Sequence, residues 1–111
     1  MMKYLLASLL LVTTASQASV VSWYGKQFHG RKTASGEVFN QNALTAASNS
    51  HKMGSKLKVT NRANGKSVVV RVTDTGGFGK YGRALDLSRG AFSKIADLSA
   101  GIAHVDIQAL D

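Results

Sequence analysis

Apolar and polar residues alternate most regularly in the middle of the chain. Leucine and valine alternate with lysine and other polar residues over 56–61, and 67–73 is a run dominated by valine. A period of two is that of a strand with one buried face. The Asn64-Gly65 dipeptide between the two segments favours a tight turn, because both residues tolerate positive φ. The pattern therefore predicts an antiparallel hairpin.

Four further short strands are predicted, separated by glycine-containing connections, over 20–24, 44–47, 84–87 and 103–109. A helix is predicted from Ser88 to about Leu98. Ser88 is a favourable N-cap, and Leu87 and Phe92 stand at the spacing of a hydrophobic staple. No long helix alternates with the strands, which argues against a doubly wound sheet. The pattern favours a mainly β domain, a small six-stranded barrel with one short α-helix.

The first 18 residues have the pattern of a secretory signal peptide. Lys3 precedes an apolar run over 4–12, and Ser16-Gln17-Ala18 places small residues at the cleavage-specifying positions. The run is shorter than the roughly 18–20 residues that a spanning helix needs, so no transmembrane segment is expected. Cleavage near Ala18 predicts a mature domain over 19–111, periplasmic or secreted. The chain has no cysteine, so this domain has no disulfide.

The chain is strongly basic, with a formal charge of +8, most of which remains on the predicted mature domain. This favours an anionic partner such as a cell-wall polymer, although a basic surface can also serve solubility alone. No helix concentrates lysine and arginine, so a nucleic-acid partner is not expected. His29, His51 and His104 lie far apart without cysteines, so we expect neither a metal nor another cofactor. The domain is expected to be a monomer.

Acidic residues are scarce, and their positions differ in what they indicate. Asp97 lies near the end of the predicted helix, Asp106 on a polar strand face and Asp111 at the terminus, none of which suggests a site. The remaining three stand near predicted strand ends, where they could line one groove: Glu37, Asp74 and Asp86.

Asp74 follows an apolar strand and opens a loop that is rich in glycine. A scaffold often presents a catalytic group at such a position. If the strand stays regular, Asp74 continues the column of Val70 and Val72, and partial burial would favour the protonated form of a usable acid. The structural alternative is an Asx turn that caps the loop. Asp86, between Leu85 and Leu87, is either a polar side chain that faces the groove or a structural carboxylate at the helix start.

Aromatic residues suggest where a sugar could pack, because flat rings match the apolar faces of sugars. Trp23 and Tyr24 are adjacent on a predicted strand and face opposite sides, so one can join the core and the other the groove. Phe28, His29 and Phe78 lie in glycine-rich loops. No Gly-x-Ser-x-Gly elbow is present, so nucleophilic serine chemistry is a weak option.

Eight ordered blocks of residues then support a family resemblance. They are Ser22-Trp23-Tyr24-Gly25, Phe28-His29-Gly30-Arg31, Thr33-Ala34-Ser35-Gly36-Glu37, Leu44-Thr45-Ala46-Ala47, Val59-Thr60-Asn61, Asn64-Gly65, Val70-Arg71-Val72-Thr73-Asp74 and Leu85-Asp86-Leu87-Ser88. Together they closely resemble the rare lipoprotein A family of septal-ring lytic transglycosylases. The resemblance implies a six-stranded double-psi β-barrel, shared more distantly with expansins and barwin-like proteins.

The resemblance also implies an activity, the cleavage of peptidoglycan glycan strands with release of 1,6-anhydro-muramyl ends. The family's functional carboxylates fall on Glu37 and Asp74. Asp74 would serve as the acid and base while the muramyl C6 hydroxyl attacks its own anomeric carbon. Glu37 would orient the sugar and stabilise its positive charge. We assign substrate binding to Asp86, Trp23, Tyr24, His29, Thr33 and Phe78.

Two positions depart from the family's pattern. Ser48 stands where the family usually has a histidine, and Asp74-Thr75-Gly76-Gly77-Phe78 replaces Asp-Arg-Gly-Pro-Phe. The second change removes an arginine and a proline from the loop beside Asp74, which predicts a looser loop. Two alternative functions therefore stay open. One is a non-catalytic, expansin-type wall-binding protein, and the other is a barwin-like inhibitor or toxin-associated binding protein.

Overall fold

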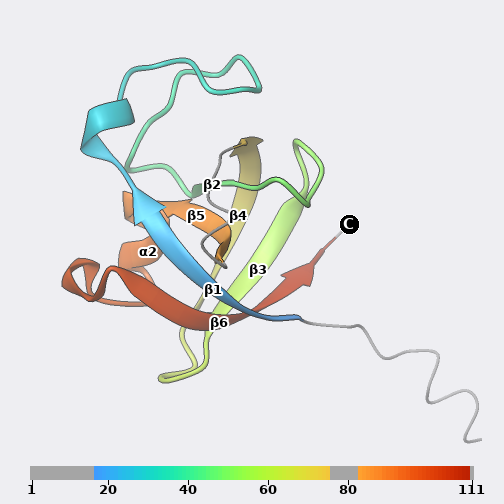
Figure 1. Cartoon of the computed structure of the whole chain (residues 1–111), viewed down its shortest axis with the longest axis vertical. Helices are drawn as coiled ribbons and strands as arrows, with labels where there is room; N and C mark the ends of the chain where they lie inside the picture. Colours follow the sequence, from blue (N-terminus) through green and yellow to red (C-terminus); the bar gives the residue numbers. More distant parts are fainter. Residues whose placement is uncertain (1–16, 76–82, 111) are drawn as a thin grey trace, which may run out of the picture.

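The computed structural model describes residues 17–75 and 83–110, which form a closed barrel of six strands in the order β1-β5-β2-β4-β3-β6 (Figure 1). One short α-helix and two 3-10 turns complete the described part of the chain. The elements are β1 (Gln17–Tyr24), η1 (Lys26–Phe28), β2 (Thr45–Ala47), β3 (Lys56–Asn61), β4 (Ser67–Asp74), β5 (Arg83–Ser88), α2 (Arg89–Ser93), η3 (Leu98–Ala100) and β6 (Ile102–Ala109). This confirms the predicted six-stranded, mainly β barrel with one short helix.

The predicted hairpin is formed by β3 and β4. Leu57 pairs with Val70 and Val59 with Val68 across the antiparallel ladder. The strands β1 and β5 pair in parallel, as do β2 and β4, while the other neighbours are antiparallel. Closure leaves no strand of the barrel as a free edge, which is how a small all-β domain avoids edge-to-edge association.

The core is formed by the inward-facing residues of the alternating strands. In β3, β4 and β6 the valines, leucine and isoleucine at every second position are buried, as the period of two predicts. Phe92 and Ile95 add large side chains from α2 and the residues after it, and both are fully buried. Phe92 and Ile95 thus join the buried strand residues in one core cluster.

Two predicted element boundaries need correction. β1 begins at Gln17, so Gln17 and Ala18 already pair with β6. The predicted helix over 88–98 is wrong in length, since α2 ends at Ser93. Ser88 caps it as predicted, its hydroxyl accepting from the Ala91 N–H at 3.1 Å. The helix stops early because the Ile95 carbonyl accepts the side-chain amides of Asn61 at 2.7 Å and Asn64 at 3.0 Å.

The long connection between β1 and β2 lies at one end of the barrel, at the top of Figure 1. It folds back on itself, with the Phe39 N–H donating to the Arg31 carbonyl at 2.7 Å. It also docks on α2, where the Gly90 N–H donates to the Gln41 carbonyl at 2.8 Å. A Cβ at Gly90 would stand 2.6 Å from the Asn42 carbonyl oxygen, so this approach requires glycine. Within 17–75 and 83–110, none of the helices is long and apolar enough to cross a membrane.

Candidate functional site

Four neighbouring strands bring two aspartates onto one face of the barrel. Ala47 of β2 pairs with Asp74 of β4 on one side and with Asp86 of β5 on the other. Asp86 in turn pairs with Ser22 of β1. Neighbouring strands lie about 4.8 Å apart, so the backbones of the two aspartates stand about 10 Å apart. The methyl side chain of Ala47 lies between them.

A shift of register decides which way Asp74 faces. Val72 pairs with Ala46, but the next pair joins Asp74 to Ala47, so Thr73 is an extra residue in β4. Val72 and Thr73 are consequently both buried, while Asp74 is only half-buried. The prediction that Asp74 continues the buried valine column is therefore wrong. An extra residue reverses the alternation, and Asp74 shares the outer face with Asp86.

Backbone N–H groups hold the Asp74 carboxylate. Its Oδ1 accepts from the Ala34 N–H at 3.0 Å and from the Thr75 N–H at 2.9 Å. The first of these bonds comes from the β1–β2 connection, which is also tied to β4 by the Ser35 N–H and the Thr73 carbonyl at 3.1 Å. Both contacts to the Asp74 carboxylate are made by Oδ1, and within the described residues no hydrogen bond reaches Oδ2 of Asp74.

Ser48, which stands in place of the family's usual histidine, lies directly beside Asp74. Its N–H donates to the Asp74 carbonyl at 2.9 Å. Its buried hydroxyl accepts the N–H groups of Ser50 and His51 at 3.2 and 3.0 Å. The side chain thus shapes the turn after β2 and supports the backbone of Asp74.

Asp86 is held from the neighbouring strand. The Ser22 hydroxyl donates to its Oδ1. Asp86 is half-buried on β5, and the buried leucines on either side of it point into the core. The alternation predicted from Leu85 and Leu87 therefore holds, and Asp86 faces outward.

Tyr24 is the aromatic residue that joins this group. Its ring stacks on Phe39, with centroids 4.5 Å apart, and meets Phe28 edge-on at 5.7 Å. Its hydroxyl is buried and has no hydrogen-bond partner among the described residues. Burial raises the pKa of this hydroxyl well above its ordinary value, and the negative charges of Asp74 and Asp86 add to the effect. The phenol is therefore a neutral donor beside both aspartates.

Trp23 lies on the other side of β1, as the alternation predicts. Its indole N–H donates to the Leu98 carbonyl at 3.1 Å, and its ring centroid is 6.4 Å from that of Phe92. The structure thus packs Trp23 against the core and does not bring it to the two aspartates. The reason is the period of two along β1, which turns Trp23 inward and leaves Tyr24, of these two aromatic residues, on the outer face.

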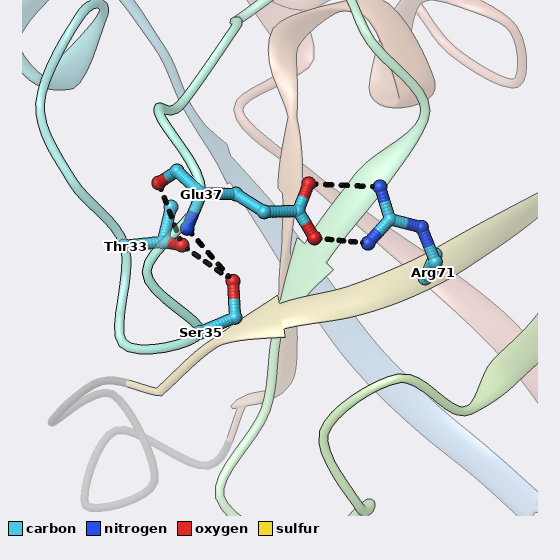
Figure 2. Close-up of polar contacts among 4 residues, drawn as sticks. All are labelled: Thr33, Ser35, Glu37 and Arg71. Carbon is cyan, nitrogen blue, oxygen red and sulfur yellow. Dashed lines mark hydrogen bonds and ion pairs between the residues drawn. The ribbon is translucent and has the colours of Figure 1, made fainter.

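Glu37 is engaged by Arg71 of β4 in a two-pronged ion pair, one oxygen bonding each terminal nitrogen (Figure 2). The NH2-to-Oε1 distance is 3.0 Å. These hydrogen bonds lower the pKa of the Glu37 carboxyl, so it remains ionised at neutral pH. The loop of Glu37 reaches Asp74 through Ala34, but its own carboxylate is turned to Arg71. The Glu37 carboxylate is therefore held in an ion pair with β4.

The other predicted binding residues have local roles. Thr33 is buried, and its hydroxyl donates to the Glu37 carbonyl at 3.0 Å and lies 2.8 Å from the Ser35 hydroxyl oxygen (Figure 2). His29 is exposed, and its Nδ1 accepts from the Gln41 N–H at 3.1 Å. Both side chains organise the β1–β2 connection. Phe78 lies outside the described residues.

A small pocket of about 110 Å³ opens beside the Glu37–Arg71 pair. It lies between the β1–β2 connection, which contributes Val38 and Phe39, and the outer face of β2 and β4, which contributes Thr45. We did not predict Arg71, Phe39 or Thr45 from the sequence. An arginine within an apolar strand was a usable signal for the first. Nothing local distinguishes the other two.

The geometry defines a class. A closed six-stranded barrel in which β1 pairs in parallel with β5 and β2 with β4 is a double-psi β-barrel domain, and here Asp74 and Asp86 lie on one outer face of it. Within the described residues, no group of three or more potential metal ligands occurs.

The sequence comparisons then place the chain in a family. The family described as "Lytic transglycolase" matches residues 16–107. A protein of Synechocystis named probable endolytic peptidoglycan transglycosylase RlpA is 53% identical over 80% of this chain and 27% of its own length. The Campylobacter jejuni endolytic peptidoglycan transglycosylase RlpA is 48% identical over 82% of this chain and 33% of its own. The chain belongs to the lytic transglycolase family, which confirms the resemblance, and it spans about a third of the length of these relatives.

Solved structures support the fold. The Streptomyces papain inhibitor superposes with a TM-score of 0.70 at 20% identity, covering 87% of this chain and 96% of its own. A mutant expansin from Clavibacter michiganensis, solved with cellohexaose, superposes with a TM-score of 0.68 at 21% identity, covering 87% of this chain and 51% of its own. At these identities the likeness concerns the barrel alone.

Proposed function

We propose that this protein is a lytic transglycosylase that cleaves the glycan strands of peptidoglycan and leaves 1,6-anhydro-muramyl ends. The observation that carries the proposal is the pairing of Asp74 and Asp86 with the two sides of Ala47, within a chain of the lytic transglycolase family. The names of its relatives, endolytic peptidoglycan transglycosylases, support the substrate class.

Asp74 is the proposed acid and base. Its Oδ1 accepts two backbone N–H groups, so Oδ2 would carry the proton. That proton passes to the glycosidic oxygen as the bond from the muramyl C1 to this oxygen breaks. The C6 hydroxyl of the same sugar then attacks C1, and its proton returns to Asp74. One carboxyl group thus serves both steps, and no water needs activation.

Asp86 and Tyr24 are proposed to act on the sugar between them. An ionised Asp86 stabilises the positive charge that develops at C1. The neutral phenol of Tyr24 can donate its unused hydrogen bond to a sugar oxygen. Glu37, kept ionised by Arg71, holds the β1–β2 connection against β4 and so positions the Ala34 N–H on Asp74. In this proposal Glu37 is a positioning residue.

We further propose that the domain acts outside the cytoplasm as a monomer, after signal cleavage near Ala18. Peptidoglycan lies there, and the N-terminal pattern of a charged residue, an apolar run and small residues supports export. The basic surface would favour association with anionic wall polymers.

Purified glycan strands offer the decisive test. Incubation with the mature domain should release fragments that end in 1,6-anhydro-muramyl residues, detected by mass spectrometry. Fragments with hydrolysed reducing ends would contradict the lytic mechanism. Binding to sacculi without any cleavage would instead favour the expansin-type wall-binding function.

A further inference from the structure

The pocket beside the Glu37–Arg71 pair has a mixed lining. Val38, Phe39 and Ala43 contribute apolar surface, while Thr33, Thr45 and Thr73 contribute hydroxyl-bearing side chains. A volume of about 110 Å³ exceeds that of a single water several-fold, so the pocket is large enough for a small organic substituent. It is too small for a whole sugar ring with its neighbours.

One polar atom of this pocket lacks a partner. The Thr45 hydroxyl is buried, and no hydrogen bond reaches its Oγ1. Thr45 precedes Ala46, which points into the core, so its side chain projects from the outer face of β2 where the pocket lies. Buried polar groups in proteins are nearly always hydrogen-bonded, so the Thr45 hydroxyl can donate to a polar atom of a group that enters the pocket.

The charges around the pocket favour a neutral occupant. Among the described residues that line it, Glu37 and Arg71 are the charged ones, and they neutralise each other through two hydrogen bonds. An anion would have to displace Glu37 from Arg71, and a cation would have to displace Arg71 from Glu37. An uncharged group with a polar and an apolar end can enter without breaking the Glu37–Arg71 ion pair.

We propose that this pocket binds the acetamido group of an N-acetylated amino sugar. The methyl group packs against Phe39 and Ala43, and the carbonyl oxygen accepts the Thr45 hydroxyl. The assignment rests on the proposed function, because the glycan of peptidoglycan carries an acetamido group on each sugar. It adds a specificity determinant: the barrel distinguishes amino sugars from plain glucose chains at Thr45.

Two uncharged β-1,4 hexasaccharides test this proposal. The N-acetylglucosamine hexamer and cellohexaose differ at C2, where one carries an acetamido group and the other a hydroxyl. Calorimetric titration of the mature domain should give about 2- to 10-fold tighter binding of the N-acetylated chain, the size of one neutral hydrogen bond. Equal affinity for the two chains would overturn the proposal.

Variants of Thr45 test whether the preference for the N-acetylated chain depends on this hydroxyl. Thr45→Val should abolish the preference without lowering the melting temperature, because the lost hydroxyl has no partner in the free protein. Thr45→Ser should restore the preference. Thr60→Val, a half-buried threonine on β3, is the matched control and should leave it intact. A Thr45→Val protein that folds and keeps the full preference would also overturn the proposal.

The outcome is separable from that of the proposed function. If the domain prefers the N-acetylated chain but does not cleave glycan strands, the acetamido pocket is supported and the lytic activity is contradicted. If the domain cleaves glycan strands but binds both hexasaccharides equally, the lytic activity is supported and the acetamido pocket is contradicted.

Discussion

Asp74 and Asp86 pair with the same residue, Ala47, from opposite sides of β2. The two carboxylates therefore stand on one face of the barrel, separated by a methyl side chain and two strand spacings. Their environments differ. Asp74 is held by backbone N–H groups, whereas Asp86 accepts the Ser22 hydroxyl. This asymmetry underlies the separate roles proposed for them.

Replacement of Asp74 tests the acid and base. Asp74→Asn keeps the shape and can still accept the Ala34 N–H, but it cannot exchange the proton. Cleavage should fall by about two orders of magnitude or more, while binding to sacculi survives. Asp106→Asn is the matched control, because the Asp106 side chain forms an exposed ion pair with Arg62 at 3.8 Å. Undiminished cleavage by Asp74→Asn would transfer the role to Asp86.

The Glu37–Arg71 pair predicts a pH dependence. The ordinary pKa of a glutamate is 4.5, and Arg71 lowers that of Glu37. Any stability from the pair is thus fully present above the ordinary value and lost as the pH falls through the lowered one. Carboxyl NMR titration should show the pKa of Glu37 below 4.5, and Arg71→Gln should return it toward the ordinary value. An unchanged titration in Arg71→Gln would refute the pairing.

Glu37→Gln should reduce cleavage less than Asp74→Asn does. The amide loses one charge but keeps the backbone contacts of its loop, including the Thr33 hydroxyl on the Glu37 carbonyl. Comparing kcat for the two variants on the same glycan preparation separates positioning from proton transfer. A loss as large as that of Asp74→Asn would restore Glu37 as a catalytic residue.

Tyr24 predicts a loss of stability in alkali. Its pKa lies above the ordinary 10.0 in the folded protein, so the phenol stays neutral there while the unfolded chain ionises. Its contribution is fully present below about pH 10 and declines as the pH rises toward the folded value. Denaturant unfolding at about pH 9 and pH 11 should show this decline, and Tyr24→Phe should remove that part of it. The variant should unfold no more easily than wild type at neutral pH, since the deleted hydroxyl has no partner.

At Gly90 we expect the usual effect of a glycine-to-alanine change on helix stability to be reversed. Alanine normally stabilises a helical position relative to glycine by about 0.5–1 kcal/mol. Here its Cβ would collide with the backbone of Asn42, so Gly90→Ala should cost about 1–3 kcal/mol. Thermal unfolding should show a drop of several degrees. Arg89→Ala, at an exposed position in the same helix, is the control and should change little.

Export predicts a mature N-terminus at Ser19. Mass spectrometry of protein recovered from outside the cytoplasm should find neither Gln17 nor Ala18. Both residues pair with β6, yet they are exposed and lie at the start of β1, so their removal leaves the rest of the strand paired. Recovery of exported protein that retains Met1 would contradict the signal peptide.

Much of the barrel follows from local pattern. The period of two in β3, β4 and β6 selects strands and their buried sides, because a side chain on a pleated strand has only two directions. The same rule separated Trp23 from Tyr24. Ser88 identified the start of α2 through its capping hydroxyl. The ordered motifs also singled out Asp74 and Glu37 as chemical groups.

Tertiary structure decided how these groups face one another. The direction of Asp74 depends on the extra residue Thr73, which exists only in the register of β4 against β2. Glu37 is ionised and occupied because it meets Arg71, 34 residues away, which no local pattern reveals. Sequence alone thus determined the secondary-structure elements and which carboxylates stand near strand ends. Both follow from the order of residues within short segments. Register and long-range pairing decided which way each carboxylate faces and which groups hold it, because both depend on contacts between distant segments.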